Sequence, residues 1–171
     1  MSVYLTEIQD YFQGLAVKHT DVLDGAGSPP RRSFFRLQSS EQIDNLPNNI
    51  GPFLILVTQF NGRAVGEFDS NKMQQNVQVR FAKKYDIPAD GDMDAAIEAA
   101  MGNSYLVMMD FISRMKKDFT DDSCGWLRFV DFQSLSWFEF DGPWLENHYG
   151  WDINIPFIAD MPDYNSGKWT S

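Results

Sequence analysis

The chain has 171 residues and a mass of 19.6 kDa, with 14 Lys and Arg against 24 Asp and Glu, which gives a formal net charge of −10. This length suits one domain that folds without disulfides or structural metals, and a composition of 43% hydrophobic and 22% charged residues excludes an intrinsically disordered chain. The single cysteine, Cys124, excludes an internal disulfide, and the longest apolar run, Phe53 to Val57, is far shorter than the roughly 20 residues of a membrane helix. The first residues lack the pattern of a signal peptide, so we expect a soluble, cytosolic protein.

Acidic residues are concentrated in the second half of the chain. Residues 1–85 carry 9 basic and 8 acidic side chains, whereas residues 86–171 carry 5 basic and 16 acidic ones. A strongly acidic half argues against a duplex-binding surface, because neutralising phosphates requires clustered Lys and Arg. Solubility is the simplest reason for this charge.

The first half predicts a helix followed by a long β-hairpin. Residues 3–18 place apolar side chains at three- and four-residue steps, as in an amphipathic helix, and residues 33–37 favour a short strand. The apolar run Phe53–Phe60 is typical of a central strand. Asn61-Gly62, which follows it, is a favoured two-residue hairpin turn.

Residues 63–71 fit either a short returning strand or a long flexible hairpin tip. From Met73 the alternation of apolar and polar residues is regular and predicts a half-buried strand that ends near Tyr85. Residues 53–85 therefore indicate one long hairpin.

The second half predicts a long helix and then more strands. Residues 92–119 carry an apolar stripe, with acids at the start and bases near the end, as the helix dipole favours. Residues 126–132 and 135–140 are aromatic-rich strand candidates, and residues 151–157 alternate as a final strand. Pro156 belongs at an edge or a bulge, because proline cannot donate to a ladder. The overall prediction is a single α+β domain over residues 1–171, with residues 161–171 as a loose tail. Its mixed or antiparallel sheet contains the long hairpin, packed by the N-terminal helix and the long central helix.

Candidate catalytic and metal-binding residues are few. The alternating acids of residues 90–94 resemble a calcium loop, but the sixth and twelfth positions are Ala95 and Met101 instead of Gly and Glu, so helix capping explains them better. His19, His148 and Cys124 are interpreted as two surface histidines and a packed thiol. A shared strand face for Glu139 and Asp141 is interpreted as a solvated face rather than an acid pair. We expect no catalytic residue, no cofactor and no metal, and hence a protein that is not an enzyme.

Aromatic residues crowd the last third of the chain. They include Trp126, Phe129, Phe132, Trp137, Phe138, Phe140, Trp144, Tyr149, Trp151 and Phe157. Most are expected in the core, and a few at a protein interface, where aromatics are enriched. A carbohydrate-binding platform built from Trp137, Trp144 and Trp151 is a further alternative.

The order of elements resembles the tail terminator proteins of long-tailed bacteriophages, which combine an N-terminal helix, a long hairpin, a packed helix and closing strands. The corresponding parts are residues 3–18, 53–85, 92–119 and 149–160, about 120 of the 171 residues. The apolar run after Gly51-Pro52 and the closing strand through residues 150–157 carry the resemblance most clearly. Residues 126–144 are an insert with no match in the family pattern. Such a resemblance is a pattern of elements and not a signature motif.

The resemblance implies a virion structural protein that forms a closed ring, a hexamer in this family. The ring would cap the tail tube and join it to the neck. Its partners would be further copies of itself, the tail tube protein and a neck or head–tail connector protein, and DNA would pass through its lumen without specific binding. The protein would be assembled in the host cytoplasm and end in the virion tail, without contact to a membrane.

Four residues are candidates for the subunit interface. Arg63, Glu67 and Phe68 lie in the polar hairpin tip, where a single aromatic side chain faces water unless a partner or the protein's own core covers it. Trp151 lies in the closing strand. The alternatives are another head–tail connector, a tail-tube-like subunit, or a module that binds sugars or small ligands through the C-terminal tryptophans.

Overall fold

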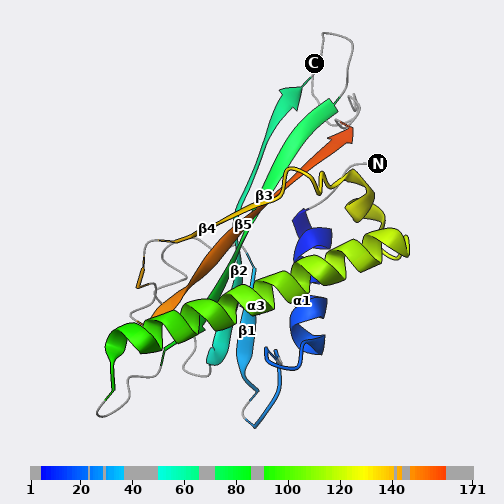
Figure 1. The fold of residues 1–171 in the computed structure, drawn as a ribbon. Coiled ribbons are helices and arrows are strands. Elements are labelled where there is room, and N and C mark those ends of the chain that lie inside the picture. The colour runs from blue at the N-terminus through cyan, green and yellow to red at the C-terminus, as the bar shows by residue number, and fades with distance from the viewer. Residues whose placement is uncertain are drawn as a thin grey trace, which may run out of the picture.

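A five-stranded sheet with the strand order β1-β2-β3-β5-β4 forms the centre of the protein (Figure 1). The computed structural model describes residues 5–22, 24–28, 30–36, 50–65, 72–85, 91–140, 142–143 and 147–160. The strands are β1 (Arg32–Phe35), β2 (Ile50–Val65), β3 (Lys72–Lys84), β4 (Ser136–Glu139) and β5 (His148–Asp160); the helices are α1 (Leu5–Lys18), α3 (Met93–Thr120) and the 3-10 helix η1 (Gly125–Phe129). β1 pairs with β2 in parallel and all other neighbours are antiparallel, which confirms the predicted α+β fold with a mixed sheet.

Both long helices pack on the same face of the sheet. Alternate residues of β2, β3 and β5 form one buried cluster with α1, α3 and η1. Phe111 of α3 lies at the centre of this cluster, with its ring 6.3 Å from that of Phe12 in α1 and 5.1 Å from that of Phe81 in β3. Asp92 caps α3 by accepting a hydrogen bond from the backbone N–H of Asp94, as the capping interpretation predicts. Among the described helices, none is long and apolar enough to cross a membrane.

The predicted hairpin of residues 53–85 is confirmed, but the predicted turn at Asn61-Gly62 is wrong. These two residues lie inside β2, where Asn61 is opposite Asn76 and Gly62 is opposite Gln75. The register pairs Phe60 with Val77 and Val57 with Val79, so that apolar residues of both strands reach the helix-facing side. A turn at residues 61–62 would break this register, because burial fixes strand pairing more strongly than a local turn preference does.

The predicted strand at residues 126–132 is also wrong. Residues 125–129 form η1, and Trp126 and Leu127 are both buried although they are consecutive. Consecutive buried side chains do not fit a strand with one covered face, because successive strand residues point to opposite faces. The helical turn instead brings Trp126, Leu127 and Val130 to the common core.

Pro156 lies in an inner strand, so the predicted edge position is wrong. β4 pairs with β5 only as far as Asn154, and an isolated bridge joins Val130 to Phe157, so Pro156 lies between the two. The carbonyl oxygen of Pro156 accepts a hydrogen bond from the backbone N–H of Asp131 at 2.9 Å. Its nitrogen points to the same side, away from β3, and the β3–β5 ladder therefore loses no donor.

Candidate assembly surface on the long hairpin

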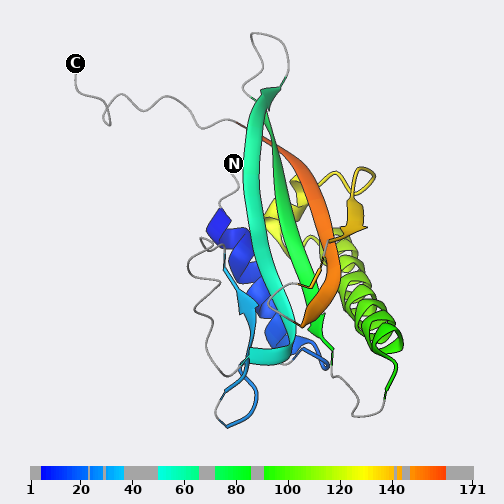
Figure 2. The same ribbon diagram turned by 90° about the vertical axis from the view of Figure 1, so that its left-hand side faces the viewer.

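The hairpin of β2 and β3 extends beyond the helical layer at one end of the molecule (Figures 1 and 2). Along this part, which we call the distal hairpin (residues 59–63 and 74–78), one face continues the core and the other is uncovered and polar. The uncovered face carries alternate residues of the two strands, since directly opposite residues of an antiparallel pair share a face. These residues are Gln59, Asn61, Arg63, Gln74, Asn76 and Gln78.

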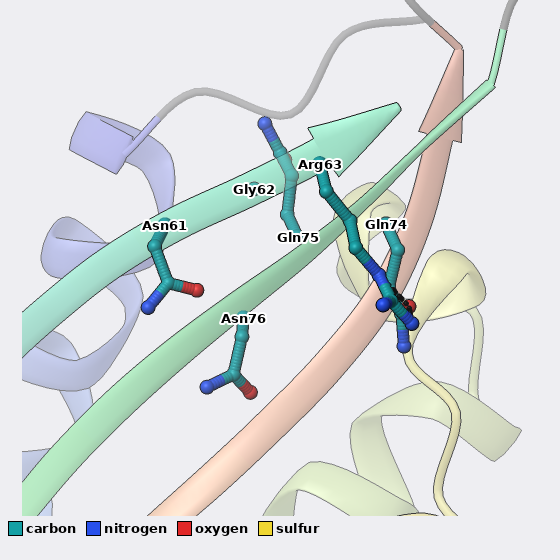
Figure 3. A pocket seen from close by; sticks show the side chains of 6 residues that line it. All are labelled: Asn61, Gly62, Arg63, Gln74, Gln75 and Asn76. Carbon is teal, nitrogen blue, oxygen red and sulfur yellow. Dashed lines mark hydrogen bonds between the residues drawn. The ribbon is translucent and has the colours of Figure 1, made fainter. Parts of the chain in front are cut away.

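Two cross-strand pairs of this face enclose a notch of about 300 Å³ (Figure 3). Asn61 and Asn76 form one pair, and Arg63 and Gln74 form the other. The pair between them, Gly62 and Gln75, directs its side-chain positions to the other face. The notch therefore lies between two rows of polar side chains, and backbone forms its floor.

The side chains around the notch include both hydrogen-bond donors and acceptors. Arg63 donates from Nε and Nη2 to Oε1 of Gln74, at 3.1 and 2.9 Å, which holds the exposed guanidinium in place. The side-chain amides of Asn61 and Asn76 have no hydrogen-bond partner among the described residues. Each amide offers donors and an acceptor, so this face suits contact with another polar protein surface.

A buried ion pair anchors the base of the distal hairpin to β5. Arg80 donates from Nε and Nη2 to the two carboxylate oxygens of Asp152, both at 2.8 Å, and Asp152 is only 1% exposed. Nε2 of Gln78 donates to the same carboxylate at 2.9 Å. The Arg80 guanidinium also lies over the ring of Phe140, 4.2 Å from its centroid. This bidentate, hydrogen-bonded arrangement fixes β3 against β5.

The structure places the four predicted interface residues differently. Arg63 is exposed on the distal hairpin, and Glu67 and Phe68 lie outside the described residues. Trp151 is half-buried beneath α3, where its Nε1 donates to the Met101 carbonyl at 3.1 Å and its ring meets Tyr105 at 5.2 Å. Arg63 is opposite Gln74 and Trp151 is opposite Phe81, so about 23 Å of strand separates them.

Trp137 and Phe138 of β4 are exposed aromatics; from the sequence, Phe138 belongs only to the general aromatic group, and Trp137 also to the alternative carbohydrate-binding platform. Trp137 is 42% exposed and Phe138 is 44% exposed, on an edge strand that pairs with β5 alone. Strand alternation directs their side chains to opposite faces of the sheet. The predicted strand at residues 135–140 is confirmed as β4, but only the observed edge position identifies these two residues as surface features.

The histidines and the cysteine lie in separate environments. The interpretation of His148 as a surface residue is wrong, because it is buried in β5. His19 follows α1, with its ring against Phe111 and its Nε2 3.4 Å from Asp110, beside a cavity of about 180 Å³ that Lys18 and Arg114 also line. Among the described residues, no three His, Cys, Asp or Glu side chains are grouped as metal ligands.

The chain was compared with protein-family models and with curated proteins, and no match was found in either comparison.

Proposed function

We propose that this protein is a structural subunit that assembles into a closed ring, of the tail-terminator kind that caps a phage tail tube and joins it to the neck. The observation that carries the proposal is the distal hairpin, which extends past the helices and presents a polar face, including the amides of Asn61 and Asn76 that have no partner among the described residues. A ring needs two different complementary surfaces on one chain. The exposed aromatics of β4, at the opposite edge of the same sheet, support a second such surface.

In this proposal the protein acts by surface complementarity and performs no reaction. Its partners are further copies of itself, the tail tube protein and a neck or head–tail connector protein. DNA passes through the lumen without specific binding.

The test is the oligomeric state of the purified chain. Native mass spectrometry from low to high micromolar concentration, with negative-stain electron microscopy, is expected to give closed rings, hexamers as the family resemblance implies. A protein that stays monomeric at every concentration, also with tail tube present, overturns the proposal. Open filaments that lengthen with concentration would identify a tube-like subunit instead.

A single charge reversal tests whether the distal hairpin takes part in assembly. Arg63→Glu reverses the charge of the one arginine beside the notch and removes its donors to Gln74. We expect it to weaken assembly at least tenfold and to leave thermal unfolding of the monomer nearly unchanged, because Arg63 is exposed. Lys116→Glu makes the same charge change at an exposed position of α3 and serves as the control. Equal weakening by both variants would point to net charge and contradict a role for the hairpin.

A further inference from the structure

Among the described residues, no strand pairs with the outer edge of β2 over more than half of its length. β1 pairs with β2 only from Ile50 to Leu56. In the described part of the chain, no strand lies on that side of β2 from Val57 to Val65. A strand edge of this length, with unpaired N–H and C=O groups, is a ready template for another strand.

We propose that this edge pairs with β4 of a second copy of the chain, so that the sheet continues from one subunit into the next. The proposal rests on the proposed assembly and names the contact that would build it. β4 is the strand at the other edge of the same sheet. Edge-to-edge contact of this kind is heterologous, as a closed ring requires.

The hydrogen bonds of the sheet show which groups of β2 point outward. The carbonyl of Pro156 points away from β3, because it accepts from Asp131. Along a strand the backbone N–H and C=O groups alternate in direction, and two opposite residues of an antiparallel pair direct these groups either toward each other or away from each other. The backbone groups of Asn76 therefore point away from β5 and toward β2, and those of Asn61 point back to Asn76. The neighbours of Asn61, which are Phe60 and Gly62, therefore direct their N–H and C=O groups to the free edge.

In β4, alternate residues direct their backbone groups away from the sheet. The backbone N–H of Phe140 donates to Gly150 of β5 at 3.4 Å, so Phe138 also points to β5. Trp137 and Glu139 consequently direct their backbone groups away from the sheet.

The two edges satisfy the conditions for an antiparallel pair. β4 runs antiparallel to β2, because each of the three pairings between them reverses direction. Gly62 is opposite Gln75 and Trp137 is opposite Ile153, so both positions belong to the helix-facing side. Opposite residues of an antiparallel pair must lie on the same face, and their backbone groups must both point toward the other strand or both point away from it. Gly62 and Trp137 lie on the same face, and the backbone groups of each point out from their own sheet, so they fit as a hydrogen-bonded pair.

Side-chain size favours the register that places Trp137 opposite Gly62. A glycine in a strand leaves room for close approach, and an aromatic ring across from it covers the exposed backbone. The ring of Trp137 is 42% exposed in the single chain and would be covered by this contact. In this register Phe138 lies opposite Asn61, next to the notch and on the uncovered face of the sheet.

Disulfide cross-linking tests the contact directly, in a Cys124→Ser background. In this register Asn61 and the partner's Phe138 form a non-hydrogen-bonded pair, with Cα atoms about 4.5 Å apart, within disulfide range. Asn61→Cys and Phe138→Cys are mixed in equal amounts and oxidised. We expect a cross-linked dimer in the mixture and little in either variant alone. Asn76→Cys mixed with Phe138→Cys is the control, because Asn76 lies on the same face but one strand further in.

The outcomes separate this inference from the proposed function. No cross-link in a protein that forms closed rings overturns the strand pairing and leaves the ring intact. A strong cross-link in Asn61→Cys alone indicates a two-fold β2–β2 contact and also overturns it. A cross-link in the mixture, in a protein that forms open filaments and no closed rings, supports the strand pairing and contradicts the proposed ring.

A second readout uses the indole itself. Trp137→Ala is expected to raise the concentration at which the assembly dissociates at least tenfold. Leu106→Ala removes a side chain that is 62% exposed on α3, in neither of the two strands of the proposed contact, and is expected to cause no change. Equal effects of the two substitutions would overturn the assignment of Trp137 to the contact.

Discussion

Asp118 is a buried carboxylate in the last turns of α3 that ties this helix to α1. It accepts hydrogen bonds from Nε of Arg114 at 2.9 Å and from the hydroxyl of Tyr11 at 2.8 Å. Burial raises the pKa of Asp118, but the hydrogen bonds from Arg114 and Tyr11 outweigh burial and hold its pKa below the usual 3.8. The unfolded chain therefore takes up this proton at higher pH than the folded protein does.

Asp118→Asn is expected to lower the free energy of unfolding at pH 7 by about 1–3 kcal/mol, because hydrogen bonds to a charged group are lost. Asp118 contributes fully to the free energy of unfolding above its ordinary pKa of 3.8. This contribution is lost as the pH falls through the lowered pKa of the folded protein. The difference between wild type and variant should therefore shrink below pH 3.8. Urea unfolding at pH 7 and pH 3 measures this difference in the free energy of unfolding. Tyr11→Phe removes one hydrogen bond to Asp118 and should lower the free energy of unfolding by about 1 kcal/mol. An unchanged difference at both pH values would contradict this role.

Cys124 is a half-buried thiol next to η1. Burial raises the pKa of Cys124, and the negative charge of Asp118 raises it further. A raised thiol pKa reduces the thiolate fraction, which is the opposite of what a nucleophile needs. Cys124→Ser should leave assembly and unfolding near wild type, and alkylation of the native thiol should be slower than that of a free thiol at pH 8. Loss of assembly in a folded Cys124→Ser protein would contradict a structural role.

At the scale of elements, the pairing of β3 with β5 depends on the absence of a side chain at Gly150. A Cβ atom at this position would collide with the carbonyl oxygen of Phe81 and lie 2.9 Å from Cα of Ala82. Both atoms belong to the backbone of β3, which cannot move aside without breaking the ladder. The close approach of these strands thus requires glycine.

Gly150→Ala is expected to destabilise the protein by about 1–3 kcal/mol or more. Gly102→Ala is the matched control, because a Cβ atom there has nothing within 4 Å and the residue lies inside α3. This second substitution should stabilise the protein by about 0.5–1 kcal/mol, since alanine is the better helix former. Denaturant unfolding of both variants measures the change in the free energy of unfolding, which should be a decrease for Gly150→Ala and an increase for Gly102→Ala. A neutral Gly150→Ala would show that the strands can separate at this point.

At the scale of the whole molecule, charge is distributed unequally between the two layers. In the described part of the second half, the exposed acids lie on α3, on the segments around its ends and on β4: Asp92, Asp94, Glu98, Asp110, Asp121, Asp122, Asp131 and Glu139. On the uncovered face of the distal hairpin the charged residue is Arg63. A ring that turns its α3 layer toward the DNA path would repel phosphates, with a range of about 8 Å at physiological salt.

The chain is expected not to bind duplex DNA at 50 or 150 mM salt, because its net charge is −10 and phosphate binding requires clustered bases. Fluorescence anisotropy with a labelled duplex measures this. Binding that weakens steeply with salt would contradict the prediction. An electrostatic map of the assembled ring then tests whether the α3 layer faces the lumen. Acids that serve only solubility would spread over the outer rim instead.

The sequence by itself determined the elements whose pattern is local. The alternation from Met73 to Phe81 defined the faces of β3, and the apolar stripe and its capping acid Asp92 defined α3, because side-chain periodicity and helix caps act over a few residues. The polar side chains around the notch follow from the same alternation. The sequence could not show that they gather there, since this depends on the register with β2.

Only the tertiary structure decided the features that depend on partners distant in the chain. Asn61-Gly62 favours a turn locally, yet pairing of Phe60 with Val77 keeps it in a strand. Trp151 donates to α3 because β5 lies between β3 and β4 beneath that helix, whereas His148, three residues earlier in β5, is buried on the opposite face of the sheet. The free edge of β2 likewise exists because β1 ends at Phe35 while its neighbour continues to Val65. Strand order and register are set by the burial of apolar surface across the whole sheet, and no local pattern in the chain records them.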